Sequence, residues 1–388
     1  MIRNFLRLGR RLTPKAFARF MKPARKRLKT TPVLASNGDR PLKMTFEDQL
    51  NALVYFHLEE HDSGRDLTQA LEENAFARQE VAPEGGIQKS SFFEALGTRG
   101  LEQLLHVYNG LMADASSLLP KDYAHLGDLQ AIDGSLVDAV LSMAWAEYRD
   151  GSKKAKVHLG FDINRGVPSR VFLSEGTADE RPFVRRILEP GQTGVMDRYY
   201  QCHRDFDRWQ AEGKHFICRI RANTRKTVLE HNPVEPGSHV FSDAVCLLGT
   251  KGQNQTAQPV RLVGYRVGKK SFWVATDRHD LSGEDVALAY KLRWNIEIFF
   301  GWWKRHLKVY HLISRSRHGL MVQILAGLIT YLLLALYCHE EYGEKVSIKR
   351  VRELRHKIEN EAAQMDADDL VPQPGEIQPG GGLATATT

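Results

Sequence analysis

The 388-residue chain is 42% apolar and 26% charged, which is typical of a globular protein and leaves room for two or three domains. Its formal net charge of +7 mildly favours a polyanionic partner. The cysteines are scattered without a C-x-x-C pair, which argues against a disulfide framework or a zinc site and indicates a reducing, cytoplasmic location.

The N-terminal segment is strongly basic. Residues 1–30 carry eleven Lys or Arg and no Asp or Glu. Such a segment is compatible with a nucleic-acid arm, a membrane-surface helix or a transit peptide, and the later motifs favour the arm. With the linker SNGDRP that follows, residues 1–40 are predicted to form a basic arm and linker.

A helical, DNA-binding domain is predicted over residues 41–125. One helix begins near Thr45, a second covers about 66–78, and the capping box Ser91-x-x-Glu94 opens a third that runs towards residue 110. A helix, a turn and a capped helix fit a helix-turn-helix-like DNA reader. Packing helices of an ordinary all-α domain explain the pattern equally well.

The hydrophobic period changes from helical to alternating at about residue 128. Three strands, a helix, a strand, a helix and a strand then follow one another, which predicts a mixed sheet with helical crossovers. The expected ranges are 129–137, 153–163 and 168–176 for the strands, 180–188 for a helix, 191–200 for a strand, 200–212 for a helix and 215–222 for a strand, all within a domain over residues 126–223.

Strand-like pieces separated by Gly, Asn and Pro turns fill residues 224–279, which predicts a β-rich insertion. The second part of the core, 280–340, opens with a helix near Ser282. It contains the apolar run 320–337, for which a buried core helix is favoured over a membrane span. A C-terminal helix over 341–370 and a disordered tail over 371–388 are expected to follow.

One polar stripe stands out on the helix after Ser282. Tyr290, Arg293, Glu297 and Lys304 lie at offsets 0, 3, 7 and 14, within about 60° of one another on a helical wheel. The rest of this helix is aliphatic and aromatic, so the stripe puts a carboxylate and two cations on a buried helix. An intrahelical ion pair of a few tenths of a kcal/mol is one interpretation. A metal-binding carboxylate beside phosphate-binding cations is the other.

Two aspartates favour the metal-binding interpretation. Asp133 and Asp197 each close an apolar strand, and the helix can bring Glu297 across to them. Three clustered carboxylates repel one another unless cations neutralise them, and all-oxygen ligation suits Mg²⁺ or Mn²⁺. Two such ions activate an attacking oxygen and stabilise the leaving oxygen of a phosphodiester. For either aspartate alone, a capping or turn role is the simpler interpretation.

These motifs carry a family resemblance. The chain is similar, over about residues 85–340, to the DDE transposases of bacterial insertion sequences, in the insertion sequence four family marked by Y-x2-R-x3-E-x6-K. All four positions of that signature match at 290–304. The contexts IDGS (132–135), KVHLGFD-x3-G-x-P (156–168) and V-M-D-R-x-Y (195–200) also match. The resemblance implies an α/β, RNase H-like core interrupted by a β insertion and preceded by a helical N-terminal domain.

The resemblance further implies a cut-and-paste transposase that binds terminal inverted repeats and target DNA as a homodimer, without a membrane. Two Mg²⁺ or Mn²⁺ ions would be held by the catalytic carboxylates, and one tryptophan would stack a flipped base unless it is a core residue of the insertion. The alternatives are a catalytically silent DNA-binding protein or repressor on the same fold, and a structure-selective nuclease. The implied residues are Asp133, Asp197 and Glu297 for metal and catalysis, and Tyr290, Arg293, Lys304, Arg198 and Trp273 for DNA.

Overall fold

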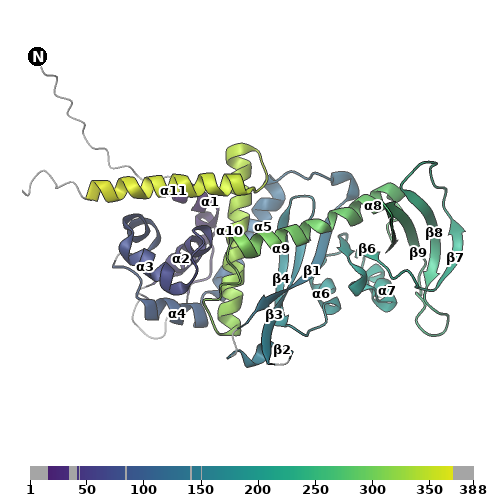
Figure 1. The fold of residues 1–388 in the computed structure, drawn as a ribbon, viewed down its shortest axis with the longest axis horizontal. Helices are drawn as coiled ribbons and strands as arrows, with labels where there is room; N and C mark the ends of the chain where they lie inside the picture. The colour runs from purple at the N-terminus through teal and green to yellow at the C-terminus, as the bar shows by residue number, and fades with distance from the viewer. Residues whose placement is uncertain are drawn as a thin grey trace, which may run out of the picture.

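The computed structural model describes residues 16–34, 42, 44–83, 85–139, 142–149 and 151–369. Figure 1 shows a bundle of helices at one end of an elongated molecule and a twisted sheet at the other, with the long helix α10 between them. The predicted mixed α/β fold with a large mixed sheet is therefore confirmed.

The sheet has ten strands in the order β2-β3-β1-β5-β6-β10-β9-β8-β7, and β4 also pairs with β3. Strand β1 runs parallel to β5, and β5 runs parallel to β6, whereas the other pairings are antiparallel. The strands are β1 (Leu129–Asp138), β2 (Glu147–Arg149), β3 (Ser152–Asp162), β4 (Val167–Glu175), β5 (Thr193–Met196), β6 (His215–Arg219), β7 (Lys226–His231), β8 (Val240–Leu248), β9 (Val260–Val267) and β10 (Lys270–Thr276).

The core between 129 and 219 follows the predicted order of elements. Helix α6 (Arg181–Ile187) connects β4 to β5, and helix α7 (His203–Ala211) connects β5 to β6. Both pack on one face of the sheet in a cluster that includes Ile132 and Phe216. The opposite face belongs to a larger core with α8 (Gly283–Leu292) and α9 (Trp294–His306), which Figure 1 shows running diagonally across the sheet.

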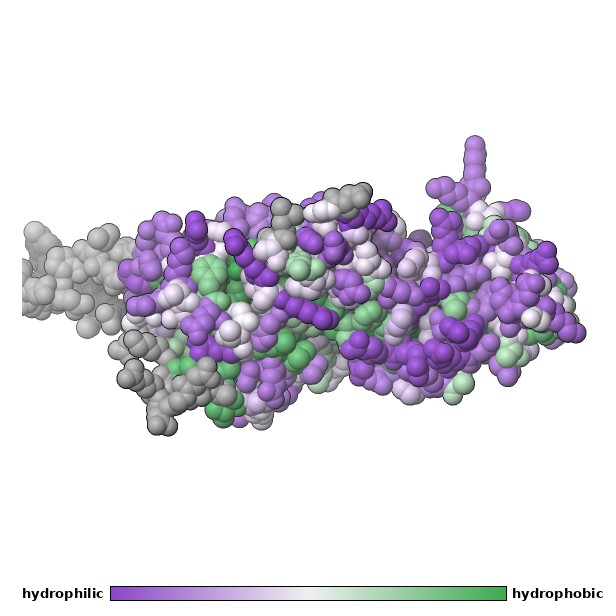
Figure 2. Space-filling model, turned by 90° about the horizontal axis from the view of Figure 1, so that it is seen from below, coloured by the Kyte–Doolittle hydropathy of each residue, from purple (hydrophilic) through white to green (hydrophobic). Residues whose placement is uncertain are grey.

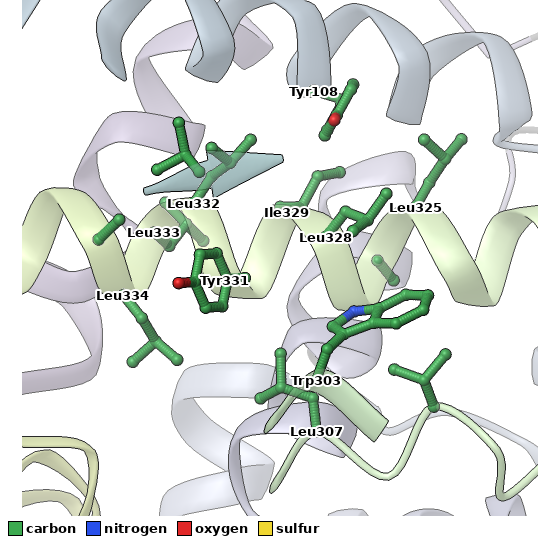
Figure 3. Close-up of a cluster of buried hydrophobic side chains, with 14 of the residues drawn as sticks. Tyr108, Trp303, Leu307, Leu325, Leu328, Ile329, Tyr331, Leu332, Leu333 and Leu334 are labelled. Atoms are coloured by element: carbon green, nitrogen blue, oxygen red, sulfur yellow. The ribbon is translucent and has the colours of Figure 1, made fainter. Parts of the chain in front are cut away.

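The helix α10 is the centre of the helical part. In Figure 3 its leucines lie between Tyr108 of α5 on one side and Trp303 and Leu307 on the other. By length and composition α10 could cross a membrane, but 89% of its most apolar window is buried inside the protein, as expected for a core helix. Helix α10 covers Arg317–Tyr342. The helices around it are α1 (Ala16–Leu28), α2 (Phe46–Leu58), α3 (Gly64–Glu73), α4 (Lys89–Thr98), α5 (Leu101–Leu118) and α11 (Ile348–Asp369).

The N-terminal basic segment contains a packed helix. Successive turns of α1 bury Phe17, Phe20 and Met21 completely, and its basic side chains lie on the remaining surface. Within the predicted arm, the stretch 16–28 is thus anchored to the helical part by apolar burial. Residues 1–15, most of the predicted linker and the predicted tail 371–388 lie outside the described residues.

Three helix boundaries differ from their predictions. The Thr45 capping box is present with Asp48, but α4 begins at Lys89 after Gln88, so Ser91 lies inside its first turn and does not cap it. The expected long third helix is divided at Gly100, whose φ of 86° ends one helix before α5 begins. The expected second helix, 66–78, ends at Glu73, and a short π-helical turn follows.

The helix that carries the polar stripe is also divided. Arg293 lies between α8 and α9, and the backbone there makes i to i+3 hydrogen bonds, from Arg293 N to Tyr290 O and from Ile296 N to Arg293 O, each 3.2 Å long. The structure therefore has two consecutive helices where the predicted stripe assumed one continuous helix.

Candidate active site

Two carboxylates lie just beyond the stretch where β1 and β5 pair. Asp197 directly follows β5, whereas Asp133 lies in the middle of β1, so the prediction that Asp133 closes its strand is wrong. The parallel register of β1 and β5 pairs Ala131 with Val195, so Asp133 and Asp197 each follow two residues beyond that pair. Because alternate residues of a strand point to the same face, both aspartates share the face covered by α8 and α9. The sheet order thus brings together two residues that are far apart in the sequence.

Asp133 is a half-buried carboxyl with a raised pKa. Burial, followed by the negative charge of Glu180, raises its pKa to about 7. A hydrogen bond from the backbone N–H of Gly134 to Asp133 Oδ1, 2.9 Å long, and the nearby charge of Arg293 act in the opposite direction. The charge of Asp197 also contributes to raising this pKa, which places the two carboxylates within electrostatic range of each other.

Asp197 begins the tight turn Arg198–Tyr200. Its Oδ1 accepts a hydrogen bond of 2.8 Å from the backbone N–H of Tyr199, so the aspartate caps that turn. The buried thiol of Cys218 on β6 donates to the backbone oxygen of Asp197 at 3.3 Å. These contacts hold the backbone of the turn at the end of the parallel strands.

Glu297 approaches this site from the first turn of α9. Its Oε1 accepts a 2.6 Å hydrogen bond from Arg293 Nη2, and about a third of its side chain is exposed. Burial disfavours the charge on Arg293, but the hydrogen bond with Glu297 and the charge of Asp133 outweigh burial and raise the pKa of the guanidinium. Arg293 therefore interacts with a predicted carboxylate on the helix and with one on the sheet.

The other two members of the polar stripe, Tyr290 and Lys304, lie next to Arg293 and next to β1 respectively. The ring of Tyr290 is 5.8 Å from the Arg293 guanidinium carbon, and burial raises the pKa of its phenol. Lys304 donates a 2.6 Å hydrogen bond to the backbone oxygen of Leu136 on β1. Burial lowers the pKa of Lys304, while the charges of Asp138 and Asp133 oppose that shift.

The carboxylates do not form a closed metal cage. Within the ranges that the structure describes, no three His, Cys, Asp or Glu side chains lie close enough together to hold a metal ion. Because unneutralised carboxylates repel one another, Glu297 pairs with Arg293 instead. Asp133 and Asp197 are oxygen donors, and burial together with negative neighbours raises the pKa of Asp133, so a hard divalent cation would offset negative charge at this donor set.

The two remaining predicted DNA contacts lie at different places. Arg198 is exposed on the turn after Asp197. Trp273 packs against the cluster on the α6 and α7 face, with Lys226 Nζ 3.8 Å from its ring centre. Its neighbour Phe272 packs on the face that carries Asp133, where Arg219 lies 4.7 Å from its ring. The sequence analysis did not single out Phe272, since only the strand register shows which of the two aromatics faces the aspartates.

Sequence reasoning also missed Glu180. This residue precedes α6, and its carboxylate lies on the α6 side of the sheet close to Asp133. The sequence contained one indirect signal, the glycine after Asp133. A Cβ atom on Gly134 would lie 2.6 Å from the carboxylate carbon of Glu180, so a larger residue there would displace that carboxylate.

A family model described as "Transposase DDE domain" matches residues 125–333, which is more than half of the chain and includes every residue of the site described above. The chain belongs to this DDE transposase family. The predicted resemblance is thereby confirmed, and divalent metal ions are the general cofactors of such families.

Curated relatives agree with this assignment. The chain is 26% identical over 215 residues to a putative transposase, y4zB, of Sinorhizobium fredii, covering 54% of this chain and 60% of the relative. It is 27% identical over 233 residues to a probable transposase for insertion sequence element IS5377 of Geobacillus stearothermophilus, covering 58% and 61%. The match therefore spans about three fifths of each relative's length.

Among solved structures, the chain is similar to a chain of the piggyBac transposase synaptic complex with hairpin DNA. The two are 12% identical in sequence with a TM-score of 0.47, and the match covers 97% of this chain and 88% of the piggyBac chain.

Proposed function

We propose that this protein is the transposase of an insertion sequence and that it cuts and joins DNA at the element's ends. The observation that carries the proposal is the placement of Asp133 and Asp197 two residues beyond the last pair of the parallel strands β1 and β5, with Arg293 and Glu297 brought to the same face by α9. Family membership supports the same conclusion. The activity would be metal-dependent hydrolysis of a phosphodiester, followed by attack of the freed 3′-hydroxyl on a second strand.

The proposed core is RNase H-like. Three antiparallel strands, β1, β3 and β4, are followed by two parallel strands reached through α6 and α7, and this arrangement supports the assignment. The four strands β7 to β10 then extend the same sheet before the chain returns through α8, which supports a β-rich insertion over 224–279. The helical, DNA-binding role of 41–125 and the other predicted domain limits remain proposals.

The side chains of the site have distinct proposed roles. Asp133, Asp197 and Glu297 would hold two Mg²⁺ or Mn²⁺ ions, which when bound supply activation of the attacking oxygen and stabilisation of the leaving oxygen. To bind a metal ion, Glu297 must break its hydrogen bond with Arg293 or keep that bond with one oxygen while the other binds the metal. Arg293 would then grip a phosphate of the DNA end, and its Nε, buried without a hydrogen-bond partner, offers a donor for a phosphate oxygen.

A basic surface beside the aspartates supports DNA as the substrate. Arg221, Arg225 and Lys226 are exposed on the segment after β6. Gln201 fixes this segment to the Asp197 turn, because its Oε1 accepts a 2.9 Å hydrogen bond from the backbone N–H of Arg221. Figure 2 shows a predominantly hydrophilic surface over the sheet end of the molecule. Phosphates bound here would lie beside the cleavage site.

The other predicted contacts complete the proposal. Tyr290 and Lys304 would bind the backbone of the transposon end, with Arg198 beside them. Trp273 remains the proposed base-stacking residue, although Phe272 offers a ring on the face of the aspartates. Two element ends must be joined in one complex, so a homodimer acting in the cytoplasm is proposed.

The experiment that tests the function is cleavage of DNA carrying the inverted repeats that flank the coding region. We expect nicks at the element ends in the presence of Mg²⁺ and none with Asp197→Asn, whose binding of the same DNA should persist. Metal-independent binding without nicks would instead support a silent DNA-binding protein or repressor. Cleavage of branched DNA regardless of its terminal sequence would support a structure-selective nuclease.

A further inference from the structure

A fourth carboxylate lies behind the two aspartates and has no part in the proposed chemistry. The side chain of Glu180 is only 14% exposed, and its Oε1 lies 3.1 Å from Lys156 Nζ. Its Oε2 accepts a 2.7 Å hydrogen bond from the hydroxyl of Tyr200. A buried carboxylate is costly unless it is paired and hydrogen-bonded, so this cluster is a built arrangement.

One side of this carboxylate rests against the middle of β1, next to Asp133. A Cβ atom on Gly134 would lie 2.6 Å from the carboxylate carbon of Glu180, and 2.7 and 2.8 Å from its two oxygens. Real Cβ atoms do not approach other atoms so closely, so Glu180 occupies the space where a side chain at 134 would stand. The Glu180 carboxylate therefore packs directly on the backbone next to Asp133.

The other side of the carboxylate reaches the turn that carries Asp197. Tyr200 ends that turn and is 1% exposed. Burial, followed by the charges of Glu180, Asp133 and Asp197, raises the pKa of its phenol, which places the ring near all three carboxylates. Lys156 on β3 offsets the charge of Glu180 and also donates a 2.9 Å hydrogen bond to the backbone oxygen of Ala178, two residues before it.

We propose that Glu180 is a positioning residue that fixes the separation of Asp133 and Asp197, acting through Gly134 on β1 and through Tyr200 in the turn after β5. It would touch neither the substrate nor the metal. The proposal rests on the proposed function, since the two aspartates are taken as metal ligands. It differs from a purely structural role because it predicts a change in metal affinity without a matching loss of fold.

The test compares Glu180→Gln and Tyr200→Phe with the wild-type protein. Glu180→Gln keeps an acceptor for Tyr200 but loses the charge facing Lys156, and Tyr200→Phe keeps the ring but loses the hydrogen bond. Glu175→Gln, at the exposed end of β4, is the matched control. Three quantities are measured for each protein, namely the melting temperature, DNA affinity, and cleavage of end-bearing DNA across a Mg²⁺ titration.

We expect both variants to fold and bind DNA like the wild type, while the Mg²⁺ concentration for half-maximal cleavage rises by about tenfold or more. The double variant should be little worse than the poorer single variant, because the two residues act through one contact. A normal Mg²⁺ requirement in both variants, or a loss of activity that simply follows a loss of folded protein, would overturn the proposal.

Mn²⁺ binding measured directly by titration calorimetry distinguishes a failure of this inference from a failure of the proposed function. Absence of cleavage by the wild type would count against the proposed function alone. Weaker Mn²⁺ binding by Glu180→Gln than by Glu175→Gln would still support the positioning role. Equal Mn²⁺ binding by those two variants would refute it.

Discussion

Glu297 differs from the two aspartates because a cation already holds it. The hydrogen bond from Arg293 Nη2 to Glu297 is 2.6 Å long, whereas half-buried Asp133 lies near the negative charges of Glu180 and Asp197. A carboxylate that joins metal ions only when they bind must exchange this partner. Glutamine at 297 would still accept a hydrogen bond from Arg293 but would be a poor metal ligand.

We therefore expect Glu297→Gln to bind end-bearing DNA nearly as well as the wild type and to lose cleavage by more than about a hundredfold. Binding is measured by mobility shift in Ca²⁺ or without metal, and cleavage by strand nicking in Mg²⁺. Glu284→Gln, in the first turn of α8, is the control and should do both normally. Weak binding with cleavage retained would remove Glu297 from the metal site.

Within α10, a buried glutamine organises the loop that follows α9. Gln323 Oε1 accepts a 3.0 Å hydrogen bond from the backbone N–H of Ile313, and its Nε2 donates to the backbone oxygen of His311 at 2.8 Å. Leucine at this position would leave the buried N–H of Ile313 without its partner. An orphaned buried group costs about 1–3 kcal/mol.

Gln323→Leu is accordingly expected to lower the free energy of unfolding by about 2 kcal/mol despite its greater hydrophobicity. The comparison is Thr330→Val, because Thr330 Oγ1 bonds only to the backbone oxygen of Ala326 in its own helix, and it should change stability by less than about 1 kcal/mol. The free energy of unfolding of both variants is measured by denaturant titration. A more stable Gln323→Leu would show that the loop finds other partners.

At the end of α2, Glu59 makes stability depend on pH. Burial, partly offset by Arg355 and reinforced by Glu359 and Glu60, raises the pKa of its carboxyl to about 7, and one of its oxygens is buried without a hydrogen-bond partner. Between about pH 4.5 and 7 the folded protein keeps a proton that the unfolded chain releases. This group therefore destabilises the fold progressively as pH rises through that window.

Glu59→Gln removes this penalty. Relative to the wild type, its free energy of unfolding should rise by about 1–3 kcal/mol between pH 5 and pH 8, as measured by denaturant titration at both values. Glu72→Gln, exposed on α3, should give a difference that does not depend on pH. A Glu59→Gln difference that stays constant with pH would mean that Arg355 already neutralises the carboxylate.

The elements that sequence alone predicts well are those whose pattern is local. Alternating residues in 153–163 give β3 within one residue at each end, and the Thr45 box marks the start of α2. The break at Arg293 and the start of α4 were missed because helix-forming residues stand on both sides of each point. Tertiary packing, which no local pattern records, decides those boundaries.

The same limit applies to the site. Asp133 and Asp197 were predictable as neighbours because each lies at the end of an apolar run, LQAID and GVMD, in strands that the predicted sheet could place side by side. Glu180 was not, since it reaches Gly134 and Tyr200 through contacts that only the folded sheet creates. Likewise, the choice between Phe272 and Trp273 depends on strand register, and shifting a register by one residue exchanges the two faces.

On the scale of the whole molecule, α1 has one apolar side that is buried and one basic side that is exposed. One side of this helix is anchored in the helical part through Phe17 and Phe20, while Lys22, Lys26 and Lys29 are exposed at spacings of four and three residues. Removing the entire basic segment would therefore remove core side chains as well as charge. Reversing the exposed charges tests the proposed DNA contact without disturbing the packing.

Changing all three lysines to glutamate should flatten the dependence of DNA affinity on salt. Each phosphate contact contributes about 0.9 to the slope of log affinity against log salt, so a loss of two to three contacts lowers the slope by about 2–3. The matched control is the same triple change at Lys251, Lys269 and Lys270, which are exposed at turns of the β7 to β10 strands. An equal effect in both triples would show that net charge alone is responsible. An unchanged slope in the α1 triple would mean that this helix faces away from the DNA.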